Sequence, residues 1–254
     1  MIVDWRKEWQ LLRTATMFLT RLPVGRNLPF NDDLMHGSAR YFPLVGALVG
    51  LFGALVYGVA VLFFPPSVAV LLSMVATVLL TGAFHEDGFA DVCDGFGGGY
   101  QREQILSIMK DSRVGSYASV GLILLLAIKF HALEALDNAA LVGPALVVGH
   151  ALSRLLAISY LIEYPYVRDS DDSKIKPMAT QMSGNALRFA AASVLPLLLL
   201  ISMWQIALIG VVLLLWRYGY GYYIHKRIGG YTGDCLGAAQ QISEVLIYLV
   251  LLAV

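Results

Sequence analysis

The chain has 254 residues, of which 58% are hydrophobic and 14% are charged, and its 18 Lys and Arg balance 18 Asp and Glu. A soluble domain carries about 25% charged residues, so this composition excludes an ordinary water-soluble fold, a coiled coil and a disordered chain. It also excludes a nucleic-acid binder, and two cysteines are too few for a secreted disulfide scaffold. The chain is therefore expected to be an integral membrane protein.

Long uncharged runs predict where the chain crosses the bilayer. Residues 41–84 contain no Asp, Glu, Lys or Arg and are interrupted by Pro65-Pro66, which predicts two membrane helices and a tight turn. The whole pattern predicts an all-α, polytopic bundle of about seven membrane helices, within a range of six to eight, in one domain over 1–254. An alternative joins the fifth and sixth helices into one bent unit. The predicted helices cover residues 41–64, 67–84, 114–136, 140–162, 186–204, 206–224 and 236–254.

The positive charges predict the orientation of this bundle. Fifteen of the 18 Lys and Arg residues fall in the N-terminal segment and in the loops after helices two, four and six, whereas Lys129 stands alone on the other side. Positive loops stay in the cytoplasm, so the N-terminus and these three loops are expected there. The sequence thus predicts a multi-pass protein of the inner membrane whose chemistry faces the cytoplasm.

A cluster of acids follows the second predicted helix, in the stretch HEDGFADVCDG that begins at His85. On a helix, Asp87, Asp91 and Asp94 fall within an arc of about 60°, with Glu86 at its flank. Like charges at the mouth of a membrane helix repel one another, so either some are protonated or a cation lies among them. Oxygen ligands without His or Cys suit Mg²⁺ or Mn²⁺, which keep positions open for phosphate oxygens. The competing interpretation is a solvated helix end.

The residues after the acids favour phosphate binding. Residues 95–99 (GFGGG) predict a flexible loop in which the backbone N–H groups of Gly97 and Gly98 can approach an anion. Residues 101–110 have apolar side chains at helical spacing, which predicts a short amphipathic helix at the membrane interface. Residues 85–113 are accordingly expected to form a cytoplasmic acidic loop and an interfacial helix that bind metal and diphosphate.

Charged side chains at the end of this region are candidates for the same site. Asp111 could complete the metal site, and Lys110 and Arg113 could hold phosphate oxygens. The alternative for the two cations is that they anchor the third membrane helix on its cytoplasmic side.

Two further candidates lie later in the chain. Residues 225–235 predict a second Gly-rich cytoplasmic loop whose Asp234 either caps the last helix or joins the site. Arg154 lies inside the fourth predicted helix, where a cation is costly, so it is either a phosphate-binding residue or a donor to helix carbonyls.

Together these motifs resemble those of cobalamin synthase, the adenosylcobinamide-GDP ribazoletransferase family. The resemblance spans almost the whole chain in the expected order. It rests on HEDG at 85–88 with Asp91, Asp94 and Gly95, on IMKDSRVG at 108–115, on FLTRLP at 18–23, on YFPLVG at 41–46 and on residues 229–239.

The resemblance implies a Mg²⁺-dependent membrane enzyme that joins adenosylcobinamide-GDP to α-ribazole or its 5′-phosphate and releases GMP. It implies that Mg²⁺ is held by the four acids of residues 85–95 and by Asp111, and that Arg113, Lys110 and Arg154 hold the non-bridging oxygens. One carboxylate, Asp91 or Asp94, is expected to accept the proton of the attacking hydroxyl. The four acids are Glu86, Asp87, Asp91 and Asp94.

Other functions remain as alternatives. A membrane prenyltransferase also holds a Mg²⁺-diphosphate on carboxylates, but a second D-x-x-D half is not found and Asp234 stands alone. A CDP-alcohol phosphotransferase is not matched, because Asp87-Gly88 is followed by Asp91-Val92 with no Arg. A cation transporter usually places its acids near the middle of the membrane. The expected partners are the two substrates and the lipid bilayer, with no nucleic acid, and association of several copies is left open.

Overall fold

The computed structural model describes residues 4–25, 28, 32–137, 140–168 and 180–254. In these ranges the regular structure is helical, and the sole extended pairing is an isolated bridge between Tyr166 and Tyr231. The all-α prediction is therefore confirmed. The helices are α1 (Trp5–Leu19), α2 (Asp32–Ser38), α3 (Phe42–Ala60), α4 (Pro66–Thr81), α5 (Phe84–Gly98), α6 (Arg102–Ile108), α7 (Ser116–Leu136), α8 (Val142–Glu163), α9 (Gly184–Val194), α10 (Met203–Ile228) and α11 (Gly233–Ala253), with 3-10 segments η1 (Ala39–Tyr41) and η3 (Leu195–Leu200).

Helices α8 and α11 form the centre of the bundle. In the most apolar 18-residue stretch of each helix, 78% of α8 and 72% of α11 is buried inside the bundle. The corresponding share of α10 is 17%, so α10 presents most of its surface outward. Helix α3 packs closely on α8 because Gly46 and Gly50 leave no room for a side chain against the carbonyls of His150 and Leu146. Small residues at such contacts are typical of helix packing in membranes.

The described helices support a helical membrane bundle. Five of them are long and apolar enough to cross a bilayer, and the number becomes six if the bent pair α4 and α5 is one span. The predicted fifth membrane helix, 186–204, is a shorter apolar segment instead. There α9 gives way to η3, where Pro196 cannot continue an α-helix, and a Ser202–Gln205 capping box starts α10 as a separate helix.

The second predicted helix is shorter than expected, and the acids do not lie at its end. Helix α4 stops at Thr81, and the axes of α4 and α5 differ by 88°. The break lies at Gly82 and Ala83, which both have positive φ, and Gly82 in the left-handed region ends α4. The acidic motif thus forms a helix of its own, so the prediction of a loop from residue 85 was wrong.

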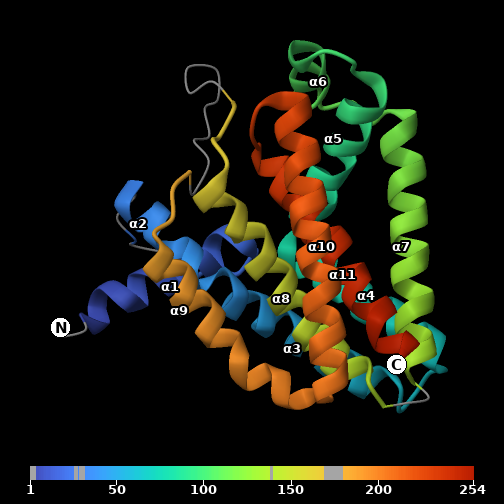
Figure 1. The fold of residues 1–254 in the computed structure, drawn as a ribbon. Coiled ribbons are helices and arrows are strands. Elements are labelled where there is room, and N and C mark those ends of the chain that lie inside the picture. Colours follow the sequence, from blue (N-terminus) through green and yellow to red (C-terminus); the bar gives the residue numbers. More distant parts are fainter. Residues whose placement is uncertain (1–3, 26–27, 29–31, 138–139, 169–179) are drawn as a thin grey trace.

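The predicted loop regions meet at one end of the bundle. Helix α6 and the adjoining ends of α5, α7 and α10 lie together at the top of Figure 1. Arg102 donates from Nε to the carbonyl of Ile228 (3.0 Å), and Arg227 donates to the carbonyl of Gly99 (2.7 Å). The loop before α11 is tied to the segment after α8, because Tyr231 N donates to the carbonyl of Pro165 (3.0 Å). Residues 85–113 and 225–235 are therefore neighbours in space.

Candidate active site

A polar cavity of about 500 Å³ opens at this end of the bundle. It lies between α5, the segment between α6 and α7, and the first turn of α11. Carboxylates and cations both face it, which is the combination that a metal-bound diphosphate requires. Its charged lining residues are Asp87, Asp91, Asp94, Lys110, Asp111, Arg113, Arg168 and Asp234.

The predicted stripe of three acids on α5 is confirmed. Asp87 is exposed and Asp91 is half-buried, and neither carboxylate accepts a hydrogen bond within the described part of the chain. Asp91 experiences the negative charges of Asp234, Asp87 and Asp94, and Arg168 opposes them. This crowding of carboxylates around Asp91 favours a bound cation or a proton at that position.

Asp94 has a different environment from its two neighbours on the stripe. Its carboxylate accepts hydrogen bonds from the backbone N–H groups of Gly115 (2.6 Å) and Ala118 (2.9 Å), at the start of α7. Gly115 is required there, because a Cβ would stand 2.5 Å from Asp94 Oδ1. Asp94 therefore caps α7 and ties it to α5, which sequence spacing does not reveal.

Asp111 and Arg113 form an ion pair at the rim of the cavity. Arg113 donates from its guanidinium to both carboxylate oxygens, at 2.5 to 3.0 Å, and its side chain is 87% exposed. These hydrogen bonds lower the pKa of Asp111 to about 2. Each partner keeps further lone pairs or N–H donors while paired, so the metal-ligand role of Asp111 and the phosphate role of Arg113 stay predictions.

Arg168 is a site residue that the sequence analysis missed. Its guanidinium donates to Asp234 Oδ2 (2.8 Å) and to the carbonyl of Met109 (3.1 Å), while its buried Nε has no partner in the described chain. Asp234 faces the cavity, which agrees with the alternative that it joins the site. The side chain that caps α11 is that of Thr232. An isolated arginine in a loop carries no local signal, so only the fold could place Arg168 here.

Gly97 and Gly98 lie in the last turn of α5 rather than in a flexible loop. A side chain at Gly97 would meet the ring of Tyr117 at 2.6 Å, and one at Gly95 would collide with Met109. These glycines serve the close packing of α5 against its neighbours. Neither Gly97 nor Gly98 lines the polar cavity, and their predicted contact with phosphate remains a prediction.

Glu86 and Arg154 face away from the polar cavity. They belong to a set of polar side chains buried between α5, α7, α8 and α11, which we call the buried polar network. Gln241 Nε2 donates to Glu86 Oε1 (2.9 Å). Arg154 donates to the carbonyl of His150 (2.9 Å), which agrees with the alternative that Arg154 is a donor to helix carbonyls. The network comprises Glu86, Lys129, His150, Arg154, Gln240, Gln241, Glu244 and Tyr248.

Lys129, which the sequence analysis assigned to the far side of the membrane, is buried within α7 and also belongs to the buried polar network. Its side chain is 7% exposed and forms an ion pair of 3.0 Å with Glu244, which is 1% exposed. Lys129 Nζ also donates to Gln241 Oε1 (2.8 Å). The charge that the sequence assigned to the far face is thus neutralised inside the bundle.

The cavity contains oxygen ligands but no assembled metal geometry. In the ranges that the structure describes, no three His, Cys, Asp or Glu side chains are arranged as a metal site. Mg²⁺ needs one or two carboxylates from a protein and takes its other ligands from phosphate and water. Asp87 and Asp91 face the cavity from α5 and can supply these carboxylates.

Comparisons with known proteins show the family of the chain. A family model described as cobalamin-5-phosphate synthase matches residues 11–252. The chain belongs to this family. It is 48% identical over 257 residues to the adenosylcobinamide-GDP ribazoletransferase of Shewanella frigidimarina, covering 99% of this chain and 97% of that protein. The proteins of the same name from Shewanella pealeana and Vibrio cholerae are each 45% identical, covering 98% of this chain and 96% and 95% of their own.

No solved structure matches the chain. Membership of the cobalamin-5-phosphate synthase family makes this protein a transferase of cobalamin synthesis. It also confirms the resemblance on which the sequence analysis relied.

Proposed function

We propose that this chain transfers the cobinamide phosphate of adenosylcobinamide-GDP to α-ribazole or its 5′-phosphate, with release of GMP. Its relatives carry the name of this reaction, the final step of nucleotide-loop assembly. One observation supports placing this reaction in the polar cavity. Five carboxylates and three cations line a single cavity at the end of the bundle where the loops meet.

We propose Mg²⁺ as the cofactor in this cavity. Asp87 and Asp91 would hold it, with Asp234 and Asp111 within the same cavity as further oxygen donors. Held by these carboxylates, Mg²⁺ would supply positive charge to offset that of the diphosphate and of the leaving GMP. Glu86 is not part of this set, because its carboxylate lies in the buried polar network.

The side chains of the cavity supply the remaining parts of the reaction. A P–O bond forms between the cobinamide-side phosphorus and a ribose hydroxyl oxygen that is free in both α-ribazole and its 5′-phosphate, and the P–O bond to GMP breaks. Arg168 and Lys110, with Arg113 at the rim, hold the non-bridging oxygens. The hydroxyl proton passes to a carboxylate, and Asp91 is the best placed, because it is half-buried and surrounded by other acids.

We also propose that the cavity faces the cytoplasm of a cell with the protein in its inner membrane. The support is the distribution of Lys and Arg, which concentrates in the segments that adjoin the cavity and in the N-terminal region.

The direct test is release of GMP by purified protein in detergent with adenosylcobinamide-GDP, α-ribazole and Mg²⁺. We expect Asp91→Asn to reduce turnover by at least 100-fold, because it removes a metal ligand and the proton acceptor. Asp33→Asn, at an exposed acid on α2 away from the cavity, is the matched control and is expected to keep full activity. No GMP from the wild-type protein would exclude the proposed reaction, and normal turnover by Asp91→Asn would exclude the role of that residue.

A further inference from the structure

Helix α1 lies at the end of the bundle where α3 begins and α4 ends, and it is too short and too charged to cross a membrane. It has 15 residues, against about 20 in a membrane helix, and four of them are charged. Figure 1 shows α1 at the edge of the bundle, running out towards the N-terminus. Its outward side therefore meets water, lipid or another protein, and its side chains distinguish these three.

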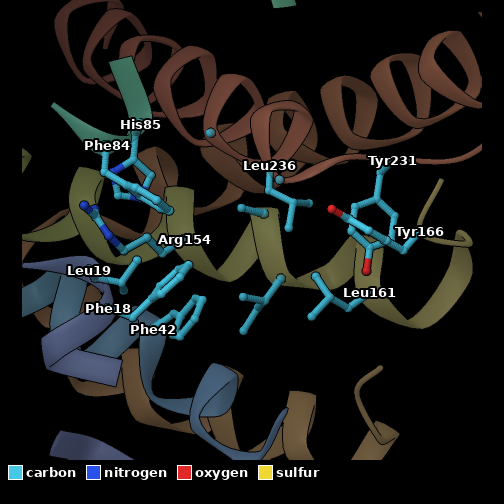
Figure 2. Close-up of a pocket in the computed structure, with 14 residues that line it drawn as sticks. Phe18, Leu19, Phe42, Phe84, His85, Arg154, Leu161, Tyr166, Tyr231 and Leu236 are labelled. Atoms are coloured by element: carbon cyan, nitrogen blue, oxygen red, sulfur yellow. The ribbon is translucent and has the colours of Figure 1, made fainter. Parts of the chain in front are cut away.

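Two contacts hold α1 across the ends of the membrane helices. Near the start of α1, Glu8 accepts a hydrogen bond from Tyr41 (2.5 Å), the residue before α3. Near its end, the ring of Phe18 stacks on that of Phe42 at 5.9 Å and meets Phe84 edge to face at 4.9 Å, as Figure 2 shows. Glu8 and Phe18 are about 15 Å apart along the helix, yet both contact the beginning of α3. Helix α1 thus crosses the end of α3 and does not descend beside it.

The apolar part of α1 is wider than the bundle covers. The face formed by every fourth residue from Leu11 to Leu19 is buried against α2 and α3. The neighbouring face, about 90° away, consists of Trp5, Trp9 and Leu12, which fall within about 60° of one another. Trp5 is 79% exposed and Trp9 is 61% exposed. Rings this exposed leave apolar surface uncovered, which is typical of a site that meets lipid or a partner.

Basic side chains lie next to the tryptophans, on the side of α1 opposite its buried face. Arg6 is exposed, and Arg13 is held in place by a hydrogen bond from Nε to the Val24 carbonyl (2.9 Å). Tryptophan beside arginine is typical of a helix in the membrane interface, where rings enter the boundary of the acyl chains and guanidinium groups meet headgroup phosphates. Water alone, or a wholly apolar protein surface, would suit only one of these two faces.

The level of α1 along the bundle matches the membrane interface. Val75 and Leu79 are exposed apolar side chains on the last two turns of α4, as expected of residues that face acyl chains. The carbonyl of the next residue, Leu80, accepts from the backbone N–H of Arg21 (2.8 Å), two residues after α1. The lipid-facing surface of α4 therefore reaches the end of α1, and α1 lies where acyl chains give way to headgroups.

We propose that α1 is an interfacial helix that binds acidic phospholipids. Trp5, Trp9 and Leu12 enter the boundary between acyl chains and headgroups, and Arg6 and Arg13 contact lipid phosphates. This inference concerns a lipid partner of the N-terminal helix. It does not depend on the reaction proposed for the polar cavity.

The first test uses lipid-borne quenchers of tryptophan fluorescence on the full chain, in vesicles of phosphatidylcholine and phosphatidylglycerol. The signal of Trp5 and Trp9 is the difference between the wild-type protein and Trp5→Phe/Trp9→Phe, two changes at exposed positions. We expect a nitroxide near the headgroup to quench this signal roughly twofold more than one at the end of the acyl chain, and iodide in the water to quench it weakly. Quenching by iodide without quenching by lipid overturns the proposal. So does protection from both quenchers, as a bound protein would give.

A tryptophan on the other side of α1 is the matched control. Lys7 is exposed and lies about 180° round the helix from the midpoint of Trp5 and Trp9. In the Trp5→Phe/Trp9→Phe background, we expect iodide to quench the signal that Lys7→Trp adds, and lipid nitroxides to leave it nearly unchanged. Equal quenching by lipid on both sides of the helix overturns the proposal, because an interfacial helix has only one side in lipid.

The preference for acidic lipid is tested by placing the nitroxide on phosphatidylglycerol or on phosphatidylcholine. We expect phosphatidylglycerol to be favoured about fivefold or more beside Trp5 and Trp9, since each cation near an acidic surface contributes about that factor. Arg6→Gln/Arg13→Gln should lose this preference. Lys7→Gln, which removes a charge from the other side of α1, should keep it. Equal quenching by the two lipids in the wild-type protein overturns the proposal of an acidic-lipid site.

Discussion

At the scale of single residues, Arg168 links the start of α11 to the segment between α6 and α7 at the polar cavity. Its Nη2 donates both to Asp234 Oδ2 at 2.8 Å and to the Met109 carbonyl at 3.1 Å, and the rigid, planar guanidinium holds that nitrogen in place better than the flexible stem of a lysine would. We expect Arg168→Lys to lower kcat/KM for adenosylcobinamide-GDP about tenfold or more, measured by GMP release. Arg188→Lys, at an exposed position of α9, is the control and should match the wild-type protein. Equal activity of the Arg168 variant would show that its charge alone is sufficient.

Asp94 allows a cap to be distinguished from a metal ligand. Asparagine has one oxygen that can still accept one of the two hydrogen bonds from α7, so it keeps part of the cap, whereas it is a poor substitute for a metal-binding carboxylate. Since Asp94 accepts from Gly115 and Ala118, we expect Asp94→Asn to retain far more activity than Asp91→Asn. Asp94→Ala should lower the stability of the folded protein by about 1 kcal/mol, measured as a fall in Tm. An Asp94→Asn variant as inactive as Asp91→Asn would restore Asp94 to the metal site.

At the scale of elements, the buried polar network joins α5 to the two central helices. Removing one charge from a buried ion pair leaves the other uncompensated, at a cost of about 3–5 kcal/mol. Glu244 faces both Lys129 (3.0 Å) and His150 (3.3 Å), so Glu244→Gln should unfold at clearly lower temperature or denaturant concentration. The double variant Lys129→Met/Glu244→Gln should be more stable than Glu244→Gln alone. Additive losses in this cycle would mean that the pair contributes no coupling energy.

The sequence predicted the membrane helices α3, α4, α7, α8, α10 and α11 because most of each lies in a long uncharged run, whereas the charged helices α1 and α2 lie outside the predicted ranges. It did not separate α5 from α4, because Gly82 and Ala83 lie inside one such run. The hydrophobic pattern does not show that their backbone is left-handed. The end of α5 was predicted as a loop, because a glycine-rich sequence is the same in a flexible loop and in a tightly packed helix. At Gly97 the helix packs against the ring of Tyr117. Local spacing found Asp87 and Asp91. Long-range partners such as Lys129 and Glu244 could be found only from the fold.

At the scale of the whole molecule, the charged polar cavity lies at one end of the bundle and distinguishes it from the other end. The polar cavity lies near the start of α7, where Ser112 is exposed at its edge. The far end of α7 lies beside the end of α3, since Tyr57 donates to Asp137 there. The turn after α3 is therefore on the opposite side of the bundle from Ser112. These two positions report the orientation of the bundle independently of activity.

We expect a cysteine at Ser112 to react with a membrane-impermeant maleimide in inverted vesicles and not in intact cells, because positive loops remain in the cytoplasm. Phe63→Cys, in the turn after α3 where Phe63 is 75% exposed, should show the reverse. Cys93 and Cys235 are replaced by alanine in both variants, so that the new thiol alone is labelled. GMP release by each variant confirms that it is folded. Labelling of Ser112→Cys in intact cells would place the acidic cavity outside, where a cytoplasmic pool of nucleotide-activated cobinamide could not reach it.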